Sequence, residues 1–204
     1  YPEAKIVALE PYEYSTLANG GLGQHRIEGI GDKMCTLIHN VLTTDFVTLV
    51  KDDDCVRGLQ VIQDRFAELK GLFGVSGLCN ILGAIKMAKH LRLGPDDNVV
   101  TIATDGFDRY NSVLEELAER ELEIADHVLD RWNRDIFLEA DERHIFDFRS
   151  QEGKEQLFKQ KEKDWLPFGY SQEYLDSMKS MEFWDGEYEK YKEYDEKIKE
   201  KRGK

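Results

Sequence analysis

Apolar and polar positions in the first half of the chain follow the pattern of strands alternating with helices. The predicted strands are residues 5–10 (KIVALE), 45–50 (DFVTLV) and 99–104 (VVTIAT). The last of these is a continuous apolar run, which is typical of a strand buried on both faces. The predicted helices are residues 34–42, 52–71 and 76–90. Strands separated by helices predict parallel pairing with right-handed crossovers, and therefore an α/β fold.

The helix that begins at Ser76 has an ordinary apolar face but an unusual start. Its apolar residues at helical spacing are Leu78, Ile81, Leu82 and Ile85. Ser76 stands where an N-cap residue is expected, and the glycines at 74 and 77 would let the backbone approach another group closely. A serine at this place is more commonly a helix cap than a ligand, so both interpretations stay open.

The second half of the chain differs in charge and in aromatic content. Residues 113–145 carry 11 acidic and 4 basic side chains on predicted helix. Residues 146–204 carry 15 acidic and 13 basic side chains interleaved with aromatic residues. This composition predicts that the aromatic side chains dock onto another surface and that the last stretch forms a solvated, ion-paired helix. We therefore expect three parts: residues 1–112, an acidic helical segment 113–145, and an aromatic, charged helical extension 146–204.

Composition and charge narrow the classes of function. With 204 residues, 41% of them hydrophobic, the chain can bury a substantial core. Its net charge of -13 argues against binding to nucleic acid or to an anionic membrane. No apolar run long enough to span a bilayer and no secretory signal pattern occurs, so the cytoplasm is the expected location. The three cysteines are odd in number and widely spaced, and no zinc-ligand spacing is present, which predicts reduced thiols and no metal site.

Two weak signals concern ligand binding. The glycine-rich loop 19–32 follows a predicted strand, but it does not complete G-x-G-x-x-G, and neither a P-loop nor a G-x-S-x-G motif occurs. Asp105 follows the predicted strand 99–104, and α/β proteins bind ligands at the carboxyl ends of their strands. Asp-Gly is also a common turn, so Asp105 by itself decides nothing.

Three segments in order give a more specific signal. HRIEGIGDKM (25–34), FGVSGLCNILGAIKMAK (73–89) and VVTIATDGFDRYNS (99–112) resemble the C-terminal half of the cysteine synthase and cystathionine β-synthase family, the fold type II pyridoxal-phosphate enzymes. The resemblance covers about residues 1–112. It implies a three-layer αβα architecture with a mostly parallel sheet, as in the tryptophan synthase β-like fold, and an α-helical C-terminal extension. Residues 1–112 would then be the C-terminal part of the domain that binds pyridoxal 5'-phosphate.

The resemblance also implies roles for individual residues. The hydroxyl of Ser76 would bind the pyridine nitrogen of the cofactor. A neutral hydroxyl does not force a proton onto that nitrogen, and the positive end of the helix dipole disfavours the proton further. The implied cofactor-binding residues are Ser76, Gly29, Ile30, Gly31 and Asp105, and the implied substrate-side residues are Glu28 and Tyr110.

The implied activity is β-elimination or β-replacement on a small amino acid of the cysteine, serine or O-acetylserine type. The family's Schiff-base lysine and phosphate-binding loop have no counterpart in this chain, so its catalytic residues are expected outside it. The expected partners are the N-terminal half of the enzyme, in the same polypeptide or in a separate chain, and a second copy in a homodimer.

Glu28, where the synthases commonly have glutamine, and the pair Asp32 and Lys33 depart from the family pattern. They would either form surface ion pairs, or favour a cationic or amine-bearing substrate or assist proton transfer. Two alternatives to the leading function remain. One is a different pyridoxal-phosphate reaction on the same fold, such as a thiolase-like, racemase or dehydratase reaction. The other is a non-catalytic subunit or scaffold that binds a partner through its aromatic tail.

Overall fold

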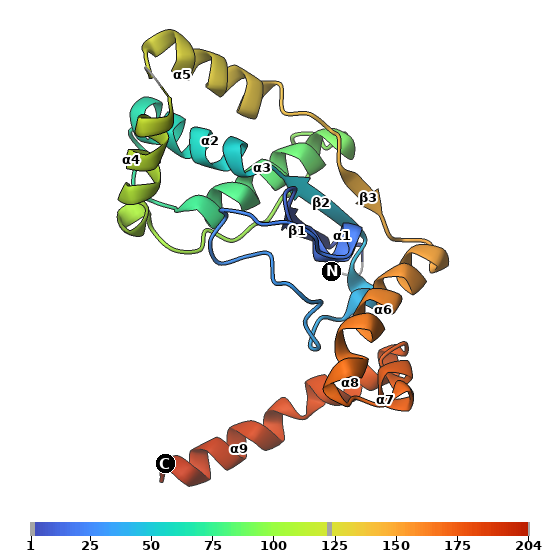
Figure 1. Cartoon of the computed structure of the whole chain (residues 1–204). Helices are drawn as coiled ribbons and strands as arrows, with labels where there is room; N and C mark the ends of the chain where they lie inside the picture. The colour runs from blue at the N-terminus through green and yellow to red at the C-terminus, as the bar shows by residue number, and fades with distance from the viewer. Residues whose placement is uncertain (1–2, 122–123, 204) are drawn as a thin grey trace.

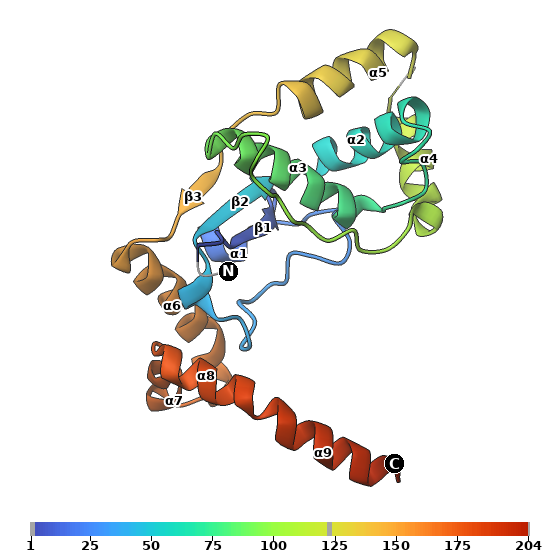
Figure 2. The same cartoon turned by 180° about the vertical axis from the view of Figure 1, so that it is seen from behind.

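A small sheet lies at the centre of the protein. In the computed structural model, which describes residues 3–121 and 124–203, β1 (Val7–Pro11) pairs in parallel with β2 (Phe46–Val50), and β3 (Ile145–Asp147) pairs antiparallel with β2 (Figures 1 and 2). The strand order is β1-β2-β3, so β1 forms one edge of the sheet. The strands predicted at 5–10 and 45–50 are confirmed, and β3 crosses the boundary that we expected at residue 145.

Helix α3 (Val75–His90) covers one face of the sheet, and α2 (Asp52–Arg65) packs against α3. The hydroxyl of Thr48 on β2 donates a hydrogen bond to the sulfur of Met87 on α3, at 3.4 Å. Two further helices, α4 (Asn111–Arg120) and α5 (Asp126–Asn133), with the π-helical turn Arg134–Leu138, complete the same core. The largest fully buried side chains of this core are Ile27, Leu59, Leu78 and Leu117.

The opposite face of the sheet packs against the second half of the chain. Val47 and Leu49 of β2 point to α1 (Thr16–Asn19) and α6 (Gln151–Trp165), where they join a second apolar cluster. The carboxylate of Glu10 accepts hydrogen bonds from three backbone N–H groups at the start of α1, at 2.8 to 3.1 Å. Helices therefore lie on both faces of the sheet, and the predicted α/β class is confirmed.

The C-terminal helices form a satellite of the second cluster. After the 3₁₀ turn Leu166–Phe168 come α7 (Gln172–Ser177), α8 (Met181–Glu189) and α9 (Tyr191–Arg202). Aromatic rings connect α6, α7 and α8 in an unbroken series from Trp165 to Trp184, with ring centroids 5.2 to 5.9 Å apart. Helix α9 projects into solvent and carries Glu-Lys ion pairs, as predicted (Figure 1). No helix in the described part of the chain has the length and apolar character needed to cross a membrane.

Two secondary-structure predictions were wrong. Residues 34–42 contain only the start of a 3₁₀ turn, Val41–Thr43, because donors on α6 bind the backbone carbonyls that a helix would need. The indole N–H of Trp165 donates to the carbonyl of Cys35, and the ammonium of Lys161 donates to two further carbonyls in this segment. Residues 99–104 are not a strand, and their apolar side chains are exposed.

The partly buried His39, in the segment 34–42, should make stability depend on pH. Burial and the charges of Lys161 and Lys154 lower the pKa of His39 to about 4 from its usual 6.5. Between those values the unfolded state binds a proton that the folded state does not, so stability falls as the pH falls from 6.5 to 4. We expect a loss of up to about 3 kcal/mol from this residue. Urea unfolding at pH 7 and pH 4.5 should show that the free energy of unfolding falls less between these two pH values in His39→Gln than in the wild-type protein.

The exposed His127 provides the matched control. His127→Gln should keep the pH dependence of the wild-type protein. An equal pH dependence in His39→Gln and the wild-type protein would contradict this account.

Candidate functional site

The start of α3 differs from the sequence-based expectation. The N-cap residue is Gly74, with extended backbone, and no side chain caps the helix. Ser76 lies one residue inside the helix, is only 3% exposed, and does not act as the cap. The capping interpretation of Ser76 was therefore wrong, and its hydroxyl is available to a different partner.

That partner comes from the apolar run that precedes Asp105. Ser76 Oγ and Thr104 Oγ1 lie 2.7 Å apart, and either hydroxyl can donate. The backbone N–H of Gly74 donates to the carbonyl of Asp105 at 2.8 Å. These two contacts join the positive end of α3 to the end of the 99–104 segment, where Thr104 is exposed.

Tyr110 and Asp105 form the adjoining part of the site. The Tyr110 hydroxyl donates to Asp105 Oδ2 at 3.0 Å. The backbone N–H of Asp105, followed by this bond from Tyr110, lowers the pKa of the Asp105 carboxyl. Burial, the bond to Asp105 and the negative charge of Glu28 raise the pKa of Tyr110. At neutral pH the site thus presents a carboxylate beside a protonated phenol.

The loop 25–31 brings glycines to the same place. It is held by Arg26, whose backbone N–H donates to Asp52 at 2.6 Å, and by Ile27, which is fully buried in the first core. Gly29 adopts a φ of +87°, and a Cβ atom there would lie 3.9 Å from Ser76 Oγ. Backbone rather than side chain therefore faces Ser76 from this loop.

The structure unites most of the predicted site residues. Ser76, Asp105 and Tyr110 lie together, with Gly29 against Ser76 and the charge of Glu28 acting on Tyr110. Ile30 packs on the first core, and Gly31 lies against His25 and Pro11 instead of Ser76.

Thr104 completes the constellation, although the sequence analysis did not select it. The available signal was its position directly before Asp105, at the end of an apolar run. Asp32 and Lys33, which depart from the family pattern, are both exposed.

The donor chemistry of this constellation fits a heteroaromatic nitrogen. Two hydroxyls share one hydrogen bond, so one hydroxyl hydrogen is left for a further acceptor. Thr104 and Gly29 lie beside Ser76, so the described residues supply one side of such a site. No cluster of His, Cys, Asp and Glu suited to a metal ion occurs among the described residues.

Gly74 makes the position of Tyr110 testable. A Cβ at residue 74 would lie 1.9 Å from Cε2 of the buried Tyr110 ring, so Gly74→Ala must displace the ring and break its bond to Asp105. We expect a loss of about 1–3 kcal/mol in the free energy of unfolding, measured by urea denaturation. Gly186→Ala on α8 is the control, because a Cβ added there would meet no atom of a packed neighbour within 4 Å. Its free energy of unfolding should rise by about 0.5–1 kcal/mol. Equal stability of the two variants would contradict the tight contact.

Comparison with known proteins gives a consistent result. No protein-family profile matches the chain. Cysteine synthase B of Campylobacter jejuni is 30% identical over 107 residues, which are 52% of this chain and 33% of that protein. Cysteine synthase of Staphylococcus aureus is 31% identical over 113 residues, which are 55% of this chain and 34% of that protein. A solved structure of the hydrogen sulfide-producing enzyme of Fusobacterium nucleatum, in complex with an α-aminoacrylate intermediate, has a TM-score of 0.50 and 27% identity, covering 72% of this chain and 38% of that one.

The chain thus spans about a third of the length of the curated relatives that it matches. The similarity includes both sequence and fold, and it agrees with the resemblance of the three sequence segments. Over about half of its length, this chain is similar to the cysteine synthases, which are pyridoxal-phosphate enzymes.

Proposed function

We propose that this chain supplies the ring-nitrogen side of a pyridoxal 5'-phosphate site in an enzyme that carries out β-elimination or β-replacement on a small amino acid. The observation that carries the proposal is the Ser76 hydroxyl, which does not cap α3 and lies 2.7 Å from Thr104 at the positive end of that helix. Such an enzyme is a lyase or a transferase acting on cysteine, serine or O-acetylserine. The homology to cysteine synthases supports this choice.

Each residue then has a physical task. When bound, pyridoxal phosphate supplies an electron sink for bond cleavage at an amino acid. Ser76 offers a neutral hydroxyl to the ring nitrogen, and the α3 dipole disfavours a proton there. The backbone of Gly29 leaves room for a flat ring, and the bond between Tyr110 and Asp105 fixes the end of the 99–104 segment.

The remaining catalytic parts belong to a partner region. The Schiff-base lysine and the phosphate-binding loop would come from the N-terminal half of the enzyme, in the same polypeptide or in another chain, and the assembly would be a homodimer. The buried lysines of the chain have other tasks, because Lys86 and Lys161 both donate to backbone carbonyls. Three free, buried cysteines support the cytoplasm as the compartment.

The proposal is tested by co-expressing the chain with the part of the S. aureus cysteine synthase that it does not match. Visible absorbance of bound pyridoxal phosphate, followed by turnover of O-acetylserine, is the expected result. A complex without bound cofactor would favour the scaffold alternative. Bound cofactor without elimination or replacement products would favour a different reaction on the same fold.

Within that complex, Ser76→Asp should lower turnover at least about tenfold more than Ser76→Ala, a difference of about 1.4 kcal/mol in barrier height. A carboxylate at this place would hold a proton on the ring nitrogen, whereas alanine only removes a hydrogen bond. The exposed Ser112 is the matched control, and its Asp and Ala variants should both keep full activity. Equal turnover in Ser76→Asp and Ser76→Ala would refute the role of Ser76.

A further inference from the structure

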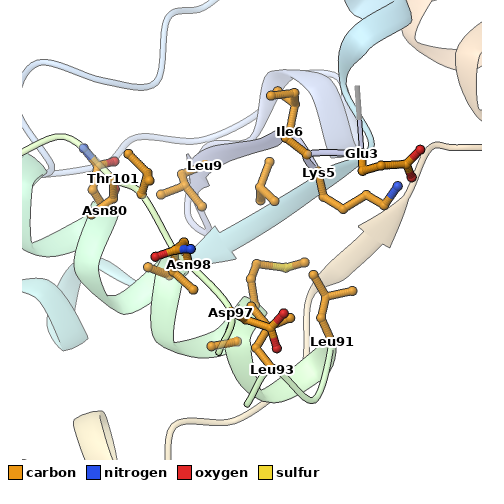
Figure 3. Close-up of a pocket in the computed structure, with 18 residues that line it drawn as sticks. Glu3, Lys5, Ile6, Leu9, Asn80, Leu91, Leu93, Asp97, Asn98 and Thr101 are labelled. Atoms are coloured by element: carbon orange, nitrogen blue, oxygen red, sulfur yellow. The ribbon is translucent and has the colours of Figure 1, made fainter. Parts of the chain in front are cut away.

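Exposed apolar side chains occur in both halves of the chain. In the first half, a hollow of about 410 Å³ between residues 3–7 and 97–101 belongs to the part that resembles the synthases (Figure 3), and we assign no new partner to it. In the second half, helix α9 projects away from the body of the protein (Figures 1 and 2), and none of its residues is buried. The neighbouring parts of the described chain therefore leave α9 uncovered.

Helix α9 carries an apolar stripe. Tyr191, Tyr194 and Ile198 follow one another at intervals of three and four residues, which places them on one face of a helix. These residues are 58%, 52% and 47% exposed. Tyr188, at the end of α8, is also exposed and lies three residues before the first of them. A continuous apolar stripe on the surface of a protein is typical of an interaction site.

The length of α9 also indicates that it needs a partner. A helix of 12 residues is only marginally stable in water when nothing packs against it. The Glu-Lys ion pairs of α9 are exposed, so they stabilise the helix only slightly. A second surface that covers the stripe would supply the apolar burial that the helix lacks.

The charges along α8 and α9 are arranged in blocks that suit an antiparallel second copy. Residues 185–189 carry three acidic side chains, and residues 190–192 carry two basic ones. Residues 193–196 carry three acidic side chains, and residues 197–202 carry four basic and one acidic. When two copies lie antiparallel with their stripes level, the last block meets the first block of the other copy, and the third block meets the second. Opposite charges then face each other along the contact.

The overall charge of the chain has little influence at this contact. The net charge of -13 opposes association of two copies, but salt screens charges that are more than about 8 Å apart at physiological ionic strength. Residues 185–202 are nearly neutral, with seven acidic and six basic side chains. Helix α9 also lies at the opposite end of the molecule from α4 and α5, in the acidic segment 113–145 (Figures 1 and 2).

We infer that two copies of this chain associate through α9, in an antiparallel pair in which Tyr191, Tyr194 and Ile198 of the two copies cover one another. A helix of 12 residues is about 18 Å long, so the contact is small and the dimer is reversible. The contact lies outside residues 1–112, which resemble the synthases, and that resemblance assigns no role to α9. The inference therefore does not depend on the proposed function.

Analytical ultracentrifugation of the 204-residue chain over a range of concentrations tests the inference. The wild-type chain should dimerise reversibly, and Ile198→Lys should raise the dimer dissociation constant at least about tenfold, because a charge then enters the apolar stripe. Lysine is a better helix former than isoleucine, so the substitution does not disfavour the helix itself. The matched control is Ile38→Lys, an exposed site outside α9 that should keep the wild-type constant.

Two results would overturn the inference. One is a wild-type chain that stays monomeric, and the other is an Ile198→Lys variant that dimerises as tightly as the wild-type chain.

Reversal of the first acidic block tests the antiparallel orientation. Asp185→Lys together with Glu189→Lys makes the chain less negative, so general repulsion between copies would fall and association would tighten. In the antiparallel pair these residues meet residues 197–202 of the other copy, so the dissociation constant should instead rise at least about tenfold. Glu68→Lys with Glu115→Lys changes two other exposed residues by the same charge and should not weaken the dimer. Unchanged or tighter association of the Asp185 and Glu189 variant would overturn the antiparallel contact.

Discussion

The organisation of this protein depends on the junction between the start of α3 and the end of the 99–104 segment. Two hydrogen bonds make that junction, one from the backbone N–H of Gly74 and one between the hydroxyls of Ser76 and Thr104. Because α3 packs on the sheet through Met87 and Gly83, the junction holds Asp105 and Tyr110 at a fixed distance from the core. The polar residues of the site are thereby fixed to a buried helix, and a binding site requires such rigidity.

Glycines determine how closely the segments of the site can meet. The Tyr110 ring occupies the space that a side chain at residue 74 would fill, and Gly29 presents only backbone to Ser76. Both glycines serve close approach, and Gly29 also takes a positive φ that other residues rarely adopt. The chemistry proposed for Ser76 is thus linked to backbone geometry on two neighbouring segments. The acidic charge of the chain lies mainly elsewhere, on α4, α5 and the turns around them.

The second half of the chain is integrated with the first. Helix α6 reaches back to the segment 34–42, where Lys161 and Trp165 bind backbone carbonyls that would otherwise be buried without partners. Strand β3 joins the sheet next to β2, and the aromatic series ending at Trp184 extends the second cluster. The extension therefore stabilises the face of the sheet opposite α3.

The sequence by itself determined the elements whose patterns are local. Strands β1 and β2 and helices α2 and α3 follow from apolar periodicity, and the three ordered motifs indicated which residues would meet around Ser76. Tertiary structure decided the rest. Residues 34–42 do not form a helix, because side chains of α6 donate hydrogen bonds to their backbone carbonyls. Gly74 is the N-cap residue of α3, so the Ser76 hydroxyl does not cap the helix and contacts Thr104 instead. The run 99–104 has strand composition but lacks paired neighbours, and a strand forms only where another strand can take up its hydrogen bonds.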